Sequence, residues 1–294
     1  IDHRRTSRTV SEFRRIMPST IKDYLQTATE RLHMHPTARL DAQVLLCAVL
    51  DVDKAYLVAH DTDALSTEHS TAFQELVARR AKGEPIAYIL GKKEFWDLEF
   101  HVSPAVLIPR PETEHLVEKA LALLKAQPHA TVADIGTGSG AIAVTIAKHS
   151  QASVHATDIS PDALAIARQN AQTYDVAITF HEGSLAQPLM DASIRVDLLL
   201  ANLPYIREDA MPHLDVAKHE PALALVAGED GLDLVRELLR QVPNVCNEHA
   251  HILLEIGMEQ GQAVKDFTEE ILSPESVTVI RDYAGLDRIV HIAL

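Results

Sequence analysis

The sequence predicts a doubly wound α/β domain with a mostly parallel sheet, preceded by a small bundle of helices. From residue 111 onward, strand-like and helix-like runs alternate, as in a parallel sheet covered by helices on both faces. Residues 18–83 instead carry apolar positions at helical spacing. Two closing strand-like runs, 276–282 and 287–293, have no helix between them. The last pair of strands should therefore be antiparallel, because a parallel pair needs a long crossover.

The helical bundle is predicted from apolar residues that recur at helical spacing behind a Ser/Thr cap, as in Ile21, Tyr24, Leu25, Ala28 and Leu32. The predicted helices cover 19–32, 40–50 and 72–81. Gly83 and Pro85 then end the helical pattern. We therefore expect a helical domain at 17–84.

A different pattern begins after the bundle. Residues 85–109 are expected to form a linker with a short hairpin, because residues typical of strands gather there: Phe95, Trp96, Leu98, Phe100 and Val102. Pro111 suits the first turn of a helix that runs to about Leu124. The second domain is therefore predicted at 110–294.

The second domain is predicted to alternate strands and helices to its end. The expected strands are 131–135, 153–157, 177–181, 196–201 and 250–256, before the closing pair. The expected helices are 141–148, 161–173, 231–241 and 259–271. A short turn at Ala284 and Gly285 joins the closing strands.

The composition indicates a folded, acidic protein. The 294 residues are 47% hydrophobic and 23% charged, close to the globular average, so a large core can form. The net charge of -15 repels nucleic-acid phosphates and argues against a nucleic-acid reader. Cys47 and Cys246 make neither a CxxC pair nor a disulfide framework, which favours a reducing compartment. Without an apolar run of roughly 18 to 20 residues, we expect a cytoplasmic protein with no membrane partner.

The first 16 residues differ from the rest. They hold five arginines against one aspartate and one glutamate and precede Met17. We expect a disordered extension upstream of a natural start at Met17; the alternative is an Arg-rich organelle-targeting peptide.

The first chemical signal is a glycine turn, Gly136-Thr-Gly138-Ser-Gly140, between a buried strand and a helix. Glycines let the backbone pass close beneath a ligand. The turn with Ala141 also satisfies the GxGxxA pattern of nicotinamide-binding proteins, so that alternative stays open on this motif. Asp134 precedes the turn, and Asp158 ends the next strand 24 residues later. Two carboxylates fit S-adenosylmethionine, which is cationic, better than a pyrophosphate, although each could simply cap a local turn.

The second signal is the strand 196–201 followed by Asn202-Leu203-Pro204-Tyr205. Pro204 biases Leu203 to an extended conformation, which leaves an amide side chain and a free carbonyl at the edge of the sheet where ligands bind. An amide or aromatic amine nitrogen is a poor nucleophile, because its lone pair is conjugated. An enzyme that methylates it should therefore hold its N–H groups on fixed acceptors, for which Asn202 and the Leu203 carbonyl are candidates. Tyr205 either packs near a sulfonium or lines an apolar cleft.

Together with further motifs, these signals resemble the release factor glutamine methyltransferases, the PrmC/HemK family of class I S-adenosylmethionine-dependent enzymes. The resemblance covers nearly all of 17–294. The further motifs are Leu40-Asp-Ala-Gln-Val-Leu-Leu46, Gly83-Glu-Pro-Ile-Ala-Tyr-Ile-Leu-Gly91, Glu94-Phe-Trp96, Val106-Leu-Ile-Pro-Arg-Pro-Glu-Thr-Glu114, Asp158-Ile-Ser-Pro-Asp-Ala163, Glu220-Pro221, Gly231-Leu-Asp233, Leu253-Leu-Glu-Ile-Gly257 and Ala284-Gly-Leu-Asp-Arg288.

The resemblance implies a class I methyltransferase fold with a seven-stranded sheet, and a cytoplasmic enzyme of translation termination. It implies that S-adenosylmethionine binds at Asp134, Gly136, Thr137, Gly138, Ser139, Gly140, Asp158, Ile159, Ser184, Leu185 and Asn202. Catalysis falls to Asn202, Leu203, Pro204 and Tyr205, which receive the glutamine of the Gly-Gly-Gln motif in a peptide-chain release factor. Phe100, Pro109, Arg110 and Glu112 would add substrate contacts, and the helical domain would contact the release factor.

Two positions depart from the family pattern. Leu203 replaces the first proline of Asn-Pro-Pro-Tyr; its backbone carbonyl is retained, but its bulkier side chain bears on substrate fit. Gly183-Ser184-Leu185 stands where relatives often carry an acidic residue and an aromatic near the adenine, which predicts weaker adenine contacts.

Other functions remain as alternatives. An N6-adenine methyltransferase of nucleic acid shares the Asn-Pro-Pro-Tyr motif, although the net charge counts against it. A catalytically impaired module that only binds release factors would follow if Leu203 spoils the site. No metal site is predicted, since His33 and His35 have no third ligand at suitable spacing.

Overall fold

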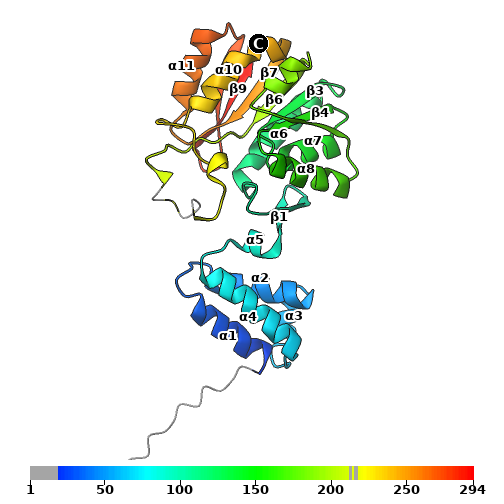
Figure 1. Ribbon diagram of the computed structural model, residues 1–294, viewed down its shortest axis with the longest axis vertical. Coiled ribbons are helices and arrows are strands. Elements are labelled where there is room, and N and C mark those ends of the chain that lie inside the picture. Colours follow the sequence, from blue (N-terminus) through cyan, green and yellow to red (C-terminus); the bar gives the residue numbers. More distant parts are fainter. Residues whose placement is uncertain (1–18, 212–213, 215–217) are drawn as a thin grey trace, which may run out of the picture. The chain divides into compact units, whose positions relative to one another are not determined.

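A computed structural model describes residues 19–211, 214 and 218–294 (Figure 1). The extension expected at 1–16 lies outside the described residues. The chain divides into two compact units, one ending at Leu90 and the other running Gly91–Leu294. Within the described residues, no helix has the length and apolar character needed to cross a membrane.

The first unit is a helical bundle, and its first, third and fourth helices begin at side-chain caps. The hydroxyl of Thr20 and the carboxylate of Asp23 form a capping box at the first helix, and the Ser66 hydroxyl accepts a hydrogen bond from the His69 N–H. The helices are α1 Ile21–Arg31, α2 Ala38–Leu50, α3 Lys54–Ala59, α4 Thr67–Ala81 and α5 Ile86–Leu90. Leu32, Leu45, Leu46 and Phe73 are fully buried in its core. The cap at Ser66 explains why α4 starts before the expected residue 72.

Residues 85–109, expected to be a linker with a hairpin, are divided between the units. The short helix α5 closes the first unit, and the antiparallel hairpin of β1 Lys92–Phe95 and β2 Leu98–His101 opens the second. Phe95 and Phe100 are buried and meet edge to face, with ring centroids 6.0 Å apart. The hairpin is thus fixed to the second unit by its own aromatic residues.

The second unit is built on a seven-stranded sheet in the order β5-β4-β3-β6-β7-β9-β8. Its strands are β3 Thr131–Ile135, β4 Ser153–Asp158, β5 Ile178–Glu182, β6 Val196–Ala201, β7 Cys246–Glu255, β8 Ser276–Arg281 and β9 Asp287–Ala293. The β9 strand runs antiparallel to both of its neighbours, whereas the other pairs are parallel. The predicted fold class, with its antiparallel closing pair, is confirmed.

Helices cover both faces of this sheet (Figure 1). They are η1 Pro111–Thr113, α6 Glu114–Leu124, α7 Ala141–His149, α8 Pro161–Thr173, α9 Gln187–Asp191, η4 Ala222–Ala224, α10 Asp233–Val245 and α11 Gly261–Ile271. One buried cluster joins α9, α10 and α11 to the sheet, and another joins α6, α7 and α8 to it. Each face therefore has its own apolar core.

The strand order places a switch point at β3. From β3 the chain moves outward through β4 to β5, then crosses back to β6 on the other side of β3. Ligands of open α/β sheets bind beyond the carboxyl ends of the strands at such a point. The glycine turn follows β3 and Asn202 follows β6, so the fold brings the two chemical signals of the sequence together.

Candidate active site

A cavity of about 390 Å³ lies where these two signals meet. It is lined by the glycine turn after β3, the end of β4, the loop after β5 and the segment after β6. Other parts of its wall come from 105–107, Pro109, Arg110, Pro221, Leu223 and Ala224. The cavity belongs wholly to the second unit.

The glycine turn owes its shape to backbone torsions that favour glycine. Gly136, Gly138 and Gly140 have φ of +72°, +56° and +81°. A Cβ on Gly140 would lie 3.1 Å from the Cβ of Ala167 in α8, so this glycine also allows the turn to pack against that helix. The N–H groups of Gly136 and Thr137 donate to the Thr157 carbonyl at 2.9 Å, which ties the turn to β4.

Asp158 lines the cavity at the end of β4. One carboxylate oxygen, Oδ2, accepts from the Gly138 N–H at 2.8 Å, and Oδ1 accepts from the Ser160 N–H at 2.9 Å. Ser160 itself caps α8 by accepting from the Ala163 N–H. The carboxylate is therefore held in place by the turn on one side and the start of α8 on the other.

Asp134, expected to contact the cofactor, lies elsewhere. It is fully buried and is absent from the cavity wall. Its Oδ2 accepts from the Thr137 hydroxyl at 2.6 Å and from the Ala143 N–H at 3.2 Å, whereas Oδ1 has no partner. Burial raises the pKa of Asp134 to about 7, against these hydrogen bonds. In this position the side chain supports the glycine turn from beneath.

The position of Asn202 is set by a residue far away in the sequence. Its Nδ2 donates to the Thr113 hydroxyl oxygen of η1 at 3.0 Å. Further along, the Tyr205 carbonyl accepts from Gln260 Nε2 at 3.2 Å, and Gly231 packs so tightly against that carbonyl that any Cβ would clash with it. Burial raises the pKa of the Tyr205 phenol. Distant parts of the chain thus hold both ends of the segment 202–205.

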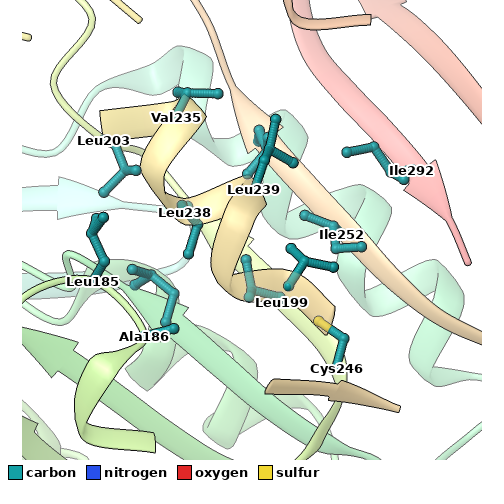
Figure 2. Close-up of a cluster of buried hydrophobic side chains, with 14 of the residues drawn as sticks. Leu185, Ala186, Leu199, Leu203, Val235, Leu238, Leu239, Cys246, Ile252 and Ile292 are labelled. Atoms are coloured by element: carbon teal, nitrogen blue, oxygen red, sulfur yellow. The ribbon is translucent and has the colours of Figure 1, made fainter. Parts of the chain in front are cut away.

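Leu203 lines the cavity and also belongs to the protein core. The residue is only 4% exposed, and its side chain joins the buried cluster with Leu185, Val235 and Leu238 (Figure 2). Its Cδ2 would lie 3.1 Å from a Cβ on Gly136, directly under the glycine turn. Leucine therefore fills apolar space between the turn and α10, and its bulk is accommodated in the core.

One buried carboxylate, that of Glu220, joins two loops that border the cavity. Glu220 Oε1 accepts from Arg110 Nη2 at 2.6 Å, and Glu220 Oε2 accepts from the Ile108 N–H at 3.2 Å. The Glu220 side chain is 3% exposed, whereas that of Arg110 is 30% exposed. Two loops more than a hundred residues apart are joined in this way.

Thirteen of the predicted site residues line the cavity and five do not. Those in its wall are Pro109, Arg110, Gly136, Thr137, Gly138, Ser139, Asp158, Ile159, Ser184, Leu185, Asn202, Leu203 and Pro204. Those outside it are Phe100, Glu112, Asp134, Gly140 and Tyr205. Phe100 is a core residue of the hairpin, and Glu112 borders a different surface hollow with Trp96 and Tyr283.

The structure adds wall residues that the sequence interpretation missed. Thr113 and Pro221 stood within quoted motifs without an assigned role. Val106, Leu107, Leu223, Ala224 and Leu234 also contribute. The apolar run at 106–108 could have indicated a cavity wall. The helical pattern around Leu234 gave no sign that this residue lines the cavity.

The charges of the cavity wall fit S-adenosylmethionine. Among the residues that the structure describes, Asp158 and Asp162 are its acidic members, and Arg110, its one cation, is engaged by Glu220. A pyrophosphate would meet these carboxylates without a free basic partner, which disfavours a nicotinamide dinucleotide. A sulfonium and an amino group meet no such repulsion.

Comparisons with known proteins cover both units. Residues 23–91 match the PrmC N-terminal domain and residues 132–218 match a methyltransferase domain. The release factor glutamine methyltransferase of Moorella thermoacetica is 40% identical over 275 residues, covering 92% of this chain and 96% of that protein. That of Xylella fastidiosa strain Temecula1 is 41% identical over 277 residues, covering 93% and 97%.

A solved structure with a similar fold covers about two thirds of the chain. It is a T. thermophilus 16S rRNA N2 G1207 methyltransferase in complex with AdoMet and guanosine, with a TM-score of 0.52 and 14% identity. The match covers 69% of this chain and 49% of that chain, and it bears on the fold alone.

Proposed function

The chain belongs to the release factor glutamine methyltransferase family, and on that basis we propose that it methylates the glutamine of the Gly-Gly-Gln motif in peptide-chain release factors. The methyl group comes from S-adenosylmethionine and goes to the side-chain amide nitrogen. The observation that carries the proposal is a shared cavity. It is lined both by Asn202, the candidate acceptor for the N–H of an amide, and by the glycine turn, the candidate binding site of this cofactor.

The cofactor end of the cavity has the residues to hold S-adenosylmethionine, which supplies an electrophilic methyl group when bound. Asp158 would accept hydrogen bonds from the ribose hydroxyls. The positive-φ glycines at 136 and 138 let backbone rather than side chains border the cofactor. Ser184 and Leu185 would border the adenine without an aromatic partner.

The transfer end would orient the glutamine. Asn202 Oδ1 and the Leu203 carbonyl would accept the two N–H groups of the amide, which directs the nitrogen toward the methyl carbon. The nitrogen–carbon bond forms as the sulfur–carbon bond breaks, and the amide nitrogen releases one proton to solvent. Orientation of this kind supplies roughly 7 to 11 kcal/mol of barrier lowering. This role needs only the backbone carbonyl of Leu203, and its side chain packs into the core.

The partner assignment rests on the first unit. The match to the PrmC N-terminal domain falls almost entirely within it, and the relatives named above carry release factor in their names. We infer that this helical unit contacts the release factor while the second unit performs the transfer.

A methyl-acceptor assay tests the substrate class. The full chain is incubated with S-adenosylmethionine that carries a tritiated methyl group, together with either a release factor or adenine-containing DNA. Label in the release factor alone is the expected result. Label in DNA would favour the adenine alternative. Release factor binding without any transfer would identify an impaired module.

A further inference from the structure

We propose that Thr113 and Glu255 are positioning residues that set the orientation of the Asn202 amide, so that its oxygen and not its nitrogen faces the substrate. The inference deepens the proposed function and rests on it for its meaning. Thr113 ends η1 and Glu255 ends β7, and neither belongs to the segment 202–205 that they would control.

The contacts form a short chain. Asn202 Nδ2 donates to Thr113 Oγ1 at 3.0 Å. The Thr113 hydroxyl lies beside the Glu255 carboxyl and lowers its pKa, while Glu255 Oε2 has no other hydrogen-bond partner among the described residues. In the sheet, Ala201 is paired with Leu254, so Asn202 and Glu255 follow at the same level on neighbouring strands. Thr113 is 3% exposed and Glu255 is 2% exposed, so water cannot readily replace either partner.

One proton decides the orientation. A threonine hydroxyl has a single hydrogen to donate, but its oxygen can also accept. When that hydrogen points to the Glu255 carboxylate, only oxygen lone pairs remain for Asn202. The amide must then offer Thr113 its NH₂ group, because a turned amide would bring two acceptors together. Oδ1 is left as the acceptor for the substrate N–H.

The orientation depends on Glu255 being ionised. If Glu255 is protonated it can donate to Thr113, and the Thr113 hydrogen can then turn to Asn202 Oδ1. Burial raises the pKa of Glu255 to about 7, although the neighbouring Thr113 hydroxyl lowers it. Of the charged groups that face it, Arg288 and Arg110 favour the carboxylate and Glu112 opposes it; the Tyr205 phenol also faces it. Methyl transfer should therefore fall as the pH drops through this range.

The first test removes the Thr113 hydroxyl without changing its shape. In the full chain with a release factor as substrate, Thr113→Val should lower kcat at least tenfold while the Kd for S-adenosylmethionine stays within twofold. Thr113→Ser, which keeps the hydroxyl, should retain most of the activity. Thr268→Val is the matched control, because Thr268 is equally buried but bonds only within α11.

The second test replaces the hydrogen-bond acceptor at position 255 by a donor. Glu255→Gln has the same shape but can donate to Thr113 at every pH, so kcat should fall at least tenfold and lose the rise with pH that is expected of the wild type. If Glu255 were only structural, Glu255→Gln should not lower kcat. The glutamine keeps the shape of the side chain and removes a charge that is costly to bury.

The third readout is independent of methyl transfer. With asparagine labelled by ¹⁵N, the Asn202 side-chain amide should exchange slowly in the wild type and in Thr113→Ser, and faster in Thr113→Val. Fast exchange in the wild type, or a Thr113→Val enzyme within twofold of wild-type kcat, would overturn the inference. If the wild type methylates no release factor, the proposed function fails, and amide exchange still decides the orientation of Asn202.

Discussion

The two ends of the cavity are built in different ways. The cofactor end is mostly one continuous strand–turn–helix, β3 to α7, whose shape follows from glycine torsions and local backbone bonds. The transfer end is a short segment held by distant side chains: Thr113 lies 89 positions before Asn202, and Gln260 lies 55 positions after Tyr205. Cofactor binding and methyl transfer should therefore fail separately when each end is altered.

Asn202→Ala gives the largest expected effect. It removes the side-chain acceptor at the transfer end, and the loss of one preorganised group at a reacting centre costs roughly a hundred- to a thousandfold in kcat. The Kd for S-adenosylmethionine, measured by calorimetry, should stay within severalfold. A variant that keeps wild-type turnover would remove Asn202 from the mechanism.

Asp134→Asn tests whether the buried carboxyl that supports the glycine turn makes stability depend on pH. With its pKa raised from 3.8 to about 7, folded Asp134 holds its proton longer than the unfolded chain does. Its contribution to stability is present below pH 3.8 and is lost as the pH rises to 7, about 4 kcal/mol in all. The asparagine variant should show a shallower fall in unfolding free energy over this range, measured by urea denaturation without cofactor. An unchanged slope would contradict the raised pKa.

Asp158→Ala tests the cofactor end of the cavity. The variant loses a carboxylate that lines the cavity, so the Kd for S-adenosylmethionine should rise roughly ten- to a hundredfold, at about 1.4 kcal/mol per tenfold. The single-turnover rate at saturating cofactor should change much less. An unaltered dissociation constant would rule out the assigned role.

Gly140→Ala tests whether the glycine turn is fixed by its torsions. An alanine at φ +81°, with its Cβ 3.1 Å from that of Ala167, should cost about 1 to 3 kcal/mol of folding stability. Gly285→Ala is the matched control, because Gly285 has the same φ but no atom within 4 Å of the added Cβ. Equal losses in both variants would assign the cost to torsion alone.

Leu203→Pro should have the smallest effect on catalysis. The backbone carbonyl is retained, so turnover should stay within about threefold, while thermal stability falls because contacts with Leu185 and α10 are lost. A rise in turnover by orders of magnitude would instead mark the natural chain as an impaired enzyme.

The sequence predicted the cofactor end well, because its determinants are local. The alternation of strands and helices gave the sheet, and the glycines gave the turn. It did not distinguish Asp134 from Asp158. That difference comes from strand register: Asp134 pairs with Ala156, so Asp158 lies two residues further along its strand, at the edge, while Asp134 is still inside the sheet.

The transfer end was predicted only in part for the opposite reason. Asn202 was found from its motif, but Thr113 and Glu255 became its neighbours only through the packing of η1 and the pairing of β6 with β7. Phe100 was assigned to the substrate from the family resemblance, and its motif does not show which face of a hairpin is buried. Contacts between distant segments carry no periodic signal in a single sequence.

The proposed function requires that the methyl group goes to the amide nitrogen of one glutamine. The most direct measurement is peptide mass spectrometry of a release factor after incubation with the full chain and S-adenosylmethionine, beside a release factor whose Gly-Gly-Gln glutamine is alanine. We expect a gain of one methyl group, about 14 Da, on that glutamine side chain and none in the alanine version. A methyl group at any other residue, or equal gains in both proteins, would contradict it.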